Sequence, residues 1–560
     1  NADSPTSPET LLHSKPNYQQ SGLYMSQSSS APTIDHLDAV VVGAGFAGLY
    51  MLHRFKQLGL RARILEAGGG VGGTWYWNRY PGARCDIPSL QYSYQFSPEL
   101  EQEWVWKERY APQPEIMAYA KHVVERFELA PDIQFNTRVA AAHFDEDNSR
   151  WSVTTEAGDV ISARFCVMAT GCLSSANDPE FPGRESFTGD WYHTGRWPHG
   201  GVDFSGQRVA VIGTGSSAIQ SIPIIAEQAV QLTVFQRTPN FSVPAHNRPQ
   251  DLREEAEVKK NYRAFRANGR AQPIAWDTAG NERTAEEHTA DEIRTECERR
   301  WEMGGLYFYG TFADLLVGKE ANDIVAEFVR GKIRERVKDP QLADALLPDT
   351  IFGCKRVCVD TGYFETYNRS NVTLVDIAQS GIEEITTHGV RADGKEYAVD
   401  AIVTATGFDA MTGSLDRIDI QGKGGLKLKD KWHAGPRTYL GLTTAGFPNF
   451  FIISGPGSPS VLTNMITSIE QHVEFVADCV AWLRDQELAS IDASIEAEDD
   501  WVDHVNEVAG ETLLLGCNSW YLGANVPGKP RVFMPYLGFP EYVEKCDTVA
   551  KNAYEGFQTA

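Results

Sequence analysis

The sequence predicts an α/β fold, because a strand, a glycine-rich turn and a helix follow one another twice. Residues 39–42 run into Gly43-Ala-Gly-Phe-Ala-Gly48, and residues 208–212 run into Gly213-Thr-Gly-Ser-Ser-Ala218. Continuous apolar strands of this kind are typical of parallel sheets covered by helices. A long charged, helix-like stretch interrupts the second unit. We therefore expect two Rossmann-like dinucleotide-binding domains with a helical insertion.

Composition limits the partners that this chain can have. Its 560 residues exceed what one hydrophobic core usually holds, so several domains are expected. The net charge of −24 argues against nucleic acid or an anionic membrane as a partner. The longest apolar run, residues 39–52, is too short to span a bilayer.

The cysteine pattern predicts a reducing compartment. Nine scattered cysteines with no Cys-x-x-Cys pair are typical of a reduced intracellular protein, so we expect free thiols, a cytoplasmic location and no metal site. Residues 1–37 are mostly rich in Ser, Pro, Gln and Thr and lack the apolar core of a secretory signal. We interpret them as an N-terminal extension that is flexible or wraps the surface, or as a remnant of processing.

The first glycine turn predicts a flavin site. Gly43 permits a tight turn, Gly45 lets the backbone approach a pyrophosphate, and Gly48 lets the helix-like stretch of residues 49–57 pack on the strand. Phe46, within the turn, is a further candidate contact of this site. The next strand ends in Glu66, whose carboxylate would accept hydrogen bonds from ribose hydroxyls and repel a 2′-phosphate. A solvated strand end would also explain an acid there, but in this context Glu66 predicts FAD.

An aromatic segment, residues 72–86, follows that strand. Its aromatic side chains can cover an isoalloxazine face, and Gly73, Thr74 and Trp75 are the candidate flavin contacts. The segment ends in Asp86 and is otherwise poor in acids, which suits a carboxylate that orients a cation. On its own, Asp86 would be an ordinary turn residue.

The strand after the second glycine turn ends in a charge of the opposite sign to that in the first unit. This strand ends in Arg237, at the place where Glu66 stands in the first unit. A guanidinium there can bind a 2′-phosphate through two parallel hydrogen bonds, so this unit is expected to take NADPH or NADP+. The candidate contacts are Gly213, Thr214, Gly215, Ser216, Ser217, Arg237 and Thr238.

Strand patterns and small-residue turns divide the chain into six segments. Residues 132–167 contain several β segments and end at Ala169-Thr-Gly171, and a second Ala-Thr-Gly at 405–407 marks the return to the first domain. We predict an N-terminal extension (1–37), a first FAD-binding segment (38–171), a first NADP-binding segment (172–241), a helical insertion (242–347), a second NADP-binding segment (348–399) and a second FAD-binding segment (400–560).

The segment that joins the two domains, residues 187–199, carries the most specific pattern. Its fixed positions are Phe187, Gly189, His193, Thr194, Trp197, Pro198 and His199. The pattern resembles the fingerprint of the type I Baeyer–Villiger monooxygenases, and residues 72–86 resemble that family's second pattern. The resemblance covers roughly residues 38–558 and is nearest to the phenylacetone and steroid monooxygenases.

The resemblance implies roles for residues that spacing alone does not single out. Lys355 falls where the family places a lysine on the NADPH 2′-phosphate, and Arg356 where it places the active-site arginine, which Asp86 would hold. Without the resemblance, two adjacent cations are ordinarily surface charge. Further implied contacts are Tyr92, Val139 and Met465 for FAD, Arg356 and Trp520 for NADP, and Cys172, Leu173, Val461, Leu462 and Met465 for the substrate pocket.

The implied activity is the conversion of ketones to esters or lactones with NADPH and O2, through a flavin C4a-peroxide, with sulfides as further substrates. A small-molecule ketone and O2 are the expected partners, and the chain is expected to be a monomer or weak oligomer. Three alternatives are a flavin monooxygenase acting on nitrogen or sulfur, a disulfide reductase, and a non-catalytic NADPH-sensing module. The Thr194 and Trp197-Pro198 end of the fingerprint argues against the first, and the absence of Cys-x-x-Cys argues against the second.

Overall fold

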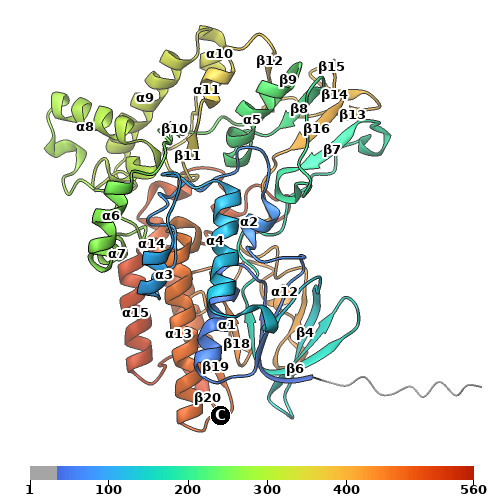
Figure 1. Ribbon diagram of the computed structural model, residues 1–560, viewed down its shortest axis with the longest axis vertical. Coiled ribbons are helices and arrows are strands. Elements are labelled where there is room, and N and C mark those ends of the chain that lie inside the picture. The colour runs from blue at the N-terminus through green and yellow to red at the C-terminus, as the bar shows by residue number, and fades with distance from the viewer. Residues whose placement is uncertain (1–34) are drawn as a thin grey trace, which may run out of the picture.

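A computed structural model describes residues 35–560 of the chain (Figure 1). The predicted extension lies outside the described residues except for residues 35–37. These three belong to strand β1 (Asp35–Val42), so the first domain begins earlier than predicted. Their backbone pairs with β6 (Val160–Met168), which lengthens the central strand of the first sheet at its N-terminal end.

The first sheet is built around β1 and β6, most of whose residues are buried. Its strand order is β17-β4-β5-β6-β1-β2-β3, and β18 also pairs with β6. The β4–β5–β6 strands are antiparallel and the other pairs are parallel. The remaining strands are β2 (Ala62–Leu65), β3 (Ile133–Gln134), β4 (Val139–Asp145), β5 (Arg150–Thr155), β17 (Asp419–Gln421) and β18 (Phe450–Ile452).

Three long helices accompany this sheet in the first domain. Helix α1 (Phe46–Gln57) packs against α13 (Met465–Asp485), and α4 (Gln113–Arg126) lies alongside in Figure 1. Because β17, β18 and α13 all come from the last third of the chain, the chain does return to the first domain after the second has been completed.

The second sheet is wholly parallel, with strand order β12-β9-β8-β16-β7. Its strands are β7 (Asp190–His193), β8 (Arg208–Ile212), β9 (Gln231–Gln236), β12 (Val372–Asp376) and β16 (Ala401–Thr404), and α5 (Ser216–Gln228) packs on them. Strand β16 lies between β8 and β7, so the second domain extends past the predicted boundary at residue 399. The four buried residues of β16 complete its core.

The inserted segment is helical, as its charge pattern indicated. It holds α6 (Leu252–Lys260), α7 (Tyr262–Arg270), α8 (Ala290–Met303), α9 (Lys319–Arg336) and α10 (Pro340–Ala345). Its first residues form a short strand, β10 (Ser242–Pro244), which pairs with β11 (Cys358–Asp360) beyond the insertion. This pairing fixes the insertion beside the segment that carries Lys355 and Arg356.

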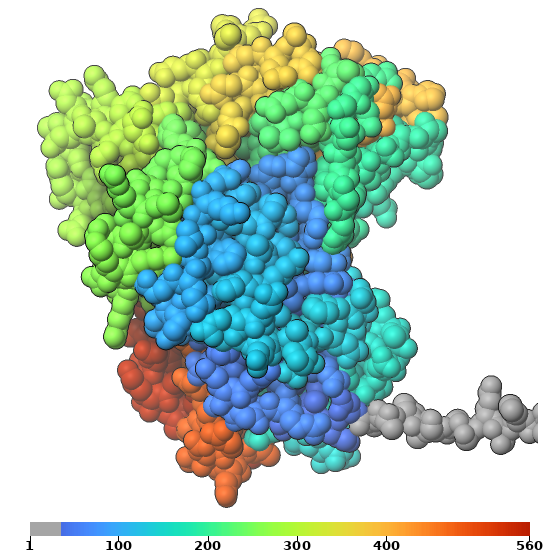
Figure 2. Space-filling model, viewed as in Figure 1, coloured from blue at the N-terminus to red at the C-terminus, as the bar shows by residue number. Residues whose placement is uncertain are grey.

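The remaining elements are short or peripheral. They are α2 (Thr74–Trp77), α3 (Pro98–Glu103), α11 (Tyr363–Thr366), α12 (Leu428–Lys431), α14 (Ile495–Gly510), α15 (Phe539–Lys551), β13 (Glu384–Thr386), β14 (Gly389–Ala392), β15 (Lys395–Ala398), β19 (Ile491–Ala493) and β20 (Phe557–Thr559). No helix within residues 35–560 has the length and apolar character needed to cross a membrane. Figure 2 shows the surface hollowed between the regions of the molecule that hold the two sheets. The predicted α/β fold with two dinucleotide-binding domains and a helical insertion is confirmed.

Candidate active site

The first glycine turn has no room for side chains. Gly43 has φ +108°, and a Cβ there would lie 2.5 Å from the carbonyl oxygen of Ala169. A Cβ on Gly48 would lie 1.9 Å from the carbonyl oxygen of Gly43. Gly45 is the N-cap of α1, and no described side chain caps this helix or places an acid in its first turn. Its first amides are therefore free to bind a phosphate, as a flavin site requires.

Glu66 is buried at the end of β2 rather than solvated. Its two carboxylate oxygens accept hydrogen bonds from the backbone N–H groups of Ala44 (2.7 Å) and Gly68 (2.6 Å). An ionised carboxylate has about four acceptor sites, so each oxygen can accept a further hydrogen bond from a ribose hydroxyl. The glycine turns thus hold Glu66 in place, and its surroundings fit the ribose of FAD.

The predicted flavin contacts after Glu66 lie close to the first turn. A Cβ on Gly73 would come within 2.8 Å of the Cα atom of Gly45, so these two backbones are in direct contact. The indole Nε1 of Trp75 donates to the hydroxyl of Tyr92 over 3.1 Å. Thr74 begins α2, Val139 begins β4 and Met465 begins α13.

The second turn repeats the first with more open space. Gly213 has φ +111°, and a Cβ there would lie 2.6 Å from the carbonyl oxygen of Ala405. Around Gly215, which caps α5, no described atom lies within 4 Å of such a Cβ. The Thr214 hydroxyl donates to the carbonyl of Thr238 over 3.0 Å, which joins the turn to the end of β9. Ser216 and Ser217 form the first turn of α5, so the residues present fit a second dinucleotide.

Arg237 and Lys355 face the same region from different segments of the second domain. Arg237 is exposed, and neither side chain forms an ion pair with any residue from 35 to 560. Burial, and then the positive charge of Arg237, lower the pKa of the Lys355 ammonium below its ordinary value. Two neighbouring cations without an ion-paired carboxylate favour an anionic ligand between them, as a 2′-phosphate would be.

Arg356 and Asp86, 270 residues apart, form a bidentate ion pair. Nε of Arg356 donates to Oδ2 of Asp86 over 2.6 Å, and Nη2 donates to Oδ1 over 3.0 Å. Nη1 donates to the carbonyl oxygen of Val461 over 2.9 Å. Burial alone would lower the pKa of Arg356, but the charge of Asp86 outweighs it and the pKa is raised, so the guanidinium stays charged. Two of its five N–H groups remain for a bound anion.

Arg356 lies in the wall of a small cavity. Its lining is mostly apolar, and the members besides Arg356 are Ile274, Trp276, Leu306, Tyr309, Leu316, Gly353, Leu462, Leu514, Tyr521 and Leu537. Of the predicted pocket residues, Leu462 lines this cavity. Cys172, Leu173, Val461 and Met465 pack in the apolar cluster beside it, together with Leu462, Trp520 and Tyr521.

One wall of the cavity comes from the insertion, which sequence patterns did not predict. Ile274, Trp276, Leu306, Tyr309 and Leu316 all belong to this segment, whose charged faces indicate solvated surface. The charged helices α6 and α8 agree with that interpretation, but the run Gly-Gly-Leu-Tyr-Phe-Tyr-Gly at 304–310 is apolar and aromatic. In the sequence, this aromatic run between charged helices indicates that one face of the insertion is buried.

His193 lies where the two domains meet. The side chain is buried at the end of β7, and burial lowers its pKa, so the imidazole is neutral near pH 7. Nδ1 accepts the Gly195 N–H over 2.9 Å, which places the ring proton on Nε2, 3.2 Å from the Asn177 carbonyl oxygen. The Thr406 hydroxyl donates to the same carbonyl over 2.6 Å.

These contacts join the fingerprint to both segments in which the chain passes between the domains; each such segment is called a crossing here. Asn177 lies in the first crossing and Thr406 in the second, and the amide Nδ2 of Asn177 also donates to the Asn525 carbonyl over 3.0 Å. At the end of the fingerprint, the ring of His199 lies 4.8 Å from that of Tyr76 in the first domain. Trp197 packs against Tyr192 at 5.6 Å. These contacts hold the fingerprint segment against both connections between the domains.

We expect His193→Ala to keep FAD but to lose NADPH-dependent turnover by roughly 10-fold, because the buried Gly195 N–H loses its acceptor and the Asn177 carbonyl loses one of its two donors. The measurement is flavin content beside steady-state product formation. His433→Ala is the matched control, since His433 is exposed and bonds the carbonyl of Asp430 in its own turn. Full turnover by FAD-loaded His193→Ala would show that the His193 contacts are ordinary packing.

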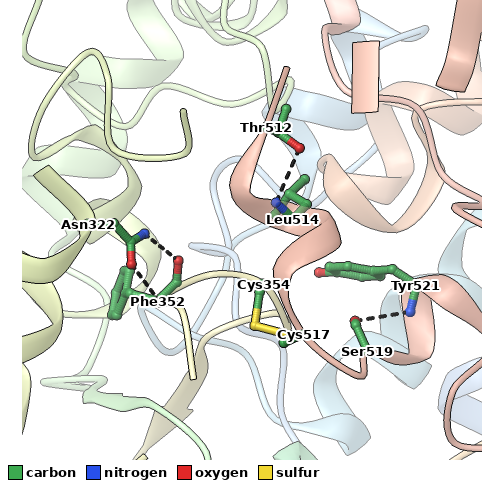
Figure 3. Close-up of a disulfide and its surroundings, with 8 residues drawn as sticks. All are labelled: Asn322, Phe352, Cys354, Thr512, Leu514, Cys517, Ser519 and Tyr521. Atoms are coloured by element: carbon green, nitrogen blue, oxygen red, sulfur yellow. Dashed lines mark hydrogen bonds between the residues drawn. A yellow bond between two sulfur atoms is a disulfide. The ribbon is translucent and has the colours of Figure 1, made fainter. Parts of the chain in front are cut away.

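The expectation that all cysteines are free is wrong for one pair. Cys354 and Cys517, 163 residues apart, form a disulfide next to the cavity (Figure 3). The other seven cysteines are unpaired and buried. The pair cannot be predicted from local pattern because it is formed by the fold: Cys354 precedes Lys355, whereas Cys517 lies in the segment before Trp520.

Comparison with known proteins places this chain in one family. The family described as pyridine nucleotide-disulphide oxidoreductase matches residues 40–274, which hold both glycine turns. The chain is 40% identical over 522 residues to a Baeyer–Villiger monooxygenase from Pseudooceanicola batsensis, covering 92% of this chain and 95% of the relative. It is 41% identical over 527 residues to a phenazine N-monooxygenase from Lysobacter antibioticus, covering 93% and 97%.

A solved structure agrees with the predicted fold and with NADP as a cofactor. A structure described as oxidized steroid monooxygenase bound to NADP superimposes with a TM-score of 0.90 at 53% identity, covering 94% of this chain and 99% of that one. The predicted resemblance is thus confirmed over the described domains. With the fingerprint at 187–199, both glycine turns and the Arg356–Asp86 pair in place, the chain belongs to the type I Baeyer–Villiger monooxygenases, FAD-containing enzymes that use NADPH and O2 to convert ketones to esters or lactones.

Proposed function

We propose that Arg356 is the catalytic cation of this ketone monooxygenase and that Asp86 positions it. When bound, FAD reduced by NADPH activates O2 and supplies the oxygen atom. Arg356 presents two unpaired N–H groups at the cavity wall, where they can stabilise negative charge that develops on oxygen during the reaction. A fixed donor in a water-excluded site needs no reorganisation at that moment, which is the usual source of its catalytic effect.

The lining of the cavity supports an apolar ketone as substrate. The side chains around the cavity are mainly apolar with a few polar groups, as is usual for small-molecule sites. The hydroxyls of Tyr309 and Tyr521 are the polar groups beside Arg356, and burial raises the pKa of both, so they remain protonated. Tyr309 accepts the Val357 N–H over 3.2 Å and keeps its proton for a ligand. An uncharged carbonyl compound fits this lining better than an acid or an amine cation.

Asp86→Asn should lower ester formation about 10-fold, since one hydrogen bond to a charged group is worth roughly 1.5–3 kcal/mol. The amide keeps the shape of the carboxylate but offers one acceptor oxygen and no charge, so Arg356 loses its fixed orientation. The loss should appear in kcat, while the rate of flavin reduction by NADPH changes little. Stopped-flow reduction and product analysis separate the two steps. A change in flavin reduction alone would contradict the positioning role.

A ketone panel tests the proposed function directly. FAD-loaded protein with NADPH is offered cyclic, aryl, linear and steroid ketones, and the products are identified by mass. We expect a gain of one oxygen in ketones that the apolar cavity can hold. The relative rates would then identify the preferred ketone, with steroid and small cyclic ketones as the two extremes that the relatives suggest.

Oxygenation of a heteroatom is the second candidate, because one relative at 41% identity is a phenazine N-monooxygenase. We propose that sulfides are additional substrates, since an apolar cavity can admit them as it admits ketones. Thioanisole and an aromatic N-heterocycle in the same panel test this. N-oxide formation faster than ester formation for every ketone would make the heteroatom activity the principal one.

We also propose that the enzyme works as a monomer or weak oligomer in the cytoplasm. The large apolar side chains that are exposed lie singly on different elements, including Val105, Val230, Leu252 and Ile495. Seven unpaired cysteines suit a reducing compartment. Light scattering at micromolar concentration tests the oligomeric state, and fractionation of the source cells tests the location.

A further inference from the structure

The Cys354–Cys517 disulfide joins two walls of the proposed ketone cavity. Gly353 and Arg356 flank Cys354, and Leu514 and Tyr521 flank Cys517; all four line the cavity. Figure 3 shows the bond between these two segments, with Tyr521 beside it. Any change in this bond therefore acts on the width of the cavity next to the catalytic cation.

The two joined segments are unequally anchored. On the Cys354 side, the amide of Asn322 in α9 holds Phe352 by two hydrogen bonds, one donated to its carbonyl (2.8 Å) and one accepted from its N–H (2.9 Å). On the other side, residues 513–516 and 520–522 form only short 3₁₀ turns. Between these turns, neither Cys517 nor Asn518 forms a hydrogen bond with any described residue. The second segment is also held by the Leu513 N–H, which donates to the Leu316 carbonyl, and by the Tyr521 carbonyl, which accepts from the Met534 N–H. The disulfide is its covalent tie to the first segment.

The bond is also the cysteine site that a reductant can reach. Cys517 is half-buried and Asn518 beside it is exposed, whereas Cys354 and the seven free cysteines are buried. Disulfides in intracellular proteins are usually transient or redox-sensing rather than structural. A disulfide that is accessible, placed at a cavity wall and attached to a segment of short 3₁₀ turns can act as a switch.

We propose that the Cys354–Cys517 disulfide sets which ketones the cavity accepts and that its reduction opens the cavity to larger ones. This inference rests on the proposed function of the cavity as the ketone site. A dithiol attacks Sγ of Cys517, Cys354 leaves as a thiolate, and the second thiol of the reductant closes its own disulfide. Two electrons and two protons pass to the protein, which then holds two thiols. Oxidised glutathione reverses the change by thiol–disulfide exchange.

The first test asks whether the bond exists and does not depend on activity. Protein purified without reductant is denatured in the presence of an alkylating reagent, and its free thiols are counted by mass. Seven free thiols, rising to nine after reduction, are expected from nine cysteines of which seven are unpaired. Nine free thiols before reduction would overturn the proposal, whatever ketones the enzyme oxidises.

The second test compares a small cyclic ketone with a steroid ketone before and after treatment with dithiothreitol. A hydrophobic wall that moves by a methylene's width changes selectivity by about 10-fold or more, so kcat/KM for the steroid relative to the small ketone should rise by that factor. Hydrogen peroxide formation should rise too, because an open cavity admits water. Oxidised glutathione should restore the original ratio.

Two variants separate the switch from general loosening. Cys517→Ser should behave like the reduced parent with or without dithiothreitol, whereas Cys297→Ala, which removes a buried free cysteine of the insertion, should respond to dithiothreitol as the parent does. Hydrogen exchange should be faster within residues 513–521 in the reduced parent and in Cys517→Ser. An unchanged substrate ratio in reduced parent protein that still forms ester would contradict the proposal and leave the proposed function standing.

Discussion

Replacing Arg356 with alanine should lower ester formation by about 100- to 1,000-fold, the usual cost of removing one preorganised donor from a site of developing negative charge. Flavin reduction by NADPH should survive, because that step does not need the two unpaired N–H groups of Arg356. Asp86 would remain without its partner, so some loss of stability is also expected. Stopped-flow reduction beside product analysis distinguishes the two steps.

Arg356→Lys is the matched control for charge. A lysine keeps the positive charge but cannot bind Asp86 and the Val461 carbonyl in the planar arrangement that Arg356 uses. We expect only partial recovery of ester formation. Thermal unfolding of both variants shows whether the fold is intact. An Arg356→Ala enzyme that forms ester near the parental rate would remove Arg356 from the chemistry.

The second large effect should be on the choice between NADPH and NADH. Lys355→Ala and Arg237→Ala should each lower kcat/KM for NADPH by about 10- to 100-fold, because a hydrogen bond to a charged group is worth roughly 1.5–3 kcal/mol. NADH lacks the 2′-phosphate, so its kcat/KM should change little. The measurement is flavin reduction with each nucleotide. Equal efficiency of the parent enzyme with NADPH and NADH would contradict both assignments.

The same pair predicts a pH dependence. Burial and Arg237 lower the pKa of Lys355 in the free enzyme, so its ammonium loses its proton at a lower pH than an ordinary lysine. Only the protonated form attracts the phosphate, and NADPH affinity should therefore fall as pH rises through that lowered pKa. Lys355→Ala should flatten this alkaline limb, while NADH should show no such limb in the parent.

The sequence predicted most reliably what depends on local geometry. The Gly43 and Gly213 turns require positive φ and leave no room for a Cβ, so their glycines mark the two domains without knowledge of the fold. The charges of Glu66 and Arg237 lie at the ends of the following strands, where spacing alone places them. The Arg356–Asp86 contact came from family resemblance, since 270 residues separate its partners.

What the sequence did not predict depends on contacts between distant segments. The boundary at residue 399 was too early, because β16 is buried between β7 and β8 and has the pattern of any apolar strand. The disulfide joins two segments that are 163 residues apart, and the wall supplied by Trp276 and Tyr309 arises only when the insertion folds back over Arg356. Local pattern carries no information about such pairings, whereas periodicity does indicate the elements themselves.

The fate of molecular oxygen distinguishes insertion beside a ketone carbonyl from simple oxidation of NADPH. The most direct measurement is the mass of the products from FAD-loaded enzyme, NADPH and an apolar ketone under ¹⁸O2. We expect an ester or lactone that carries one ¹⁸O atom, formed by the parent and strongly diminished in Arg356→Ala. Oxidation of NADPH that yields hydrogen peroxide but no labelled ester from any ketone in the panel would show that the chain is not a Baeyer–Villiger catalyst.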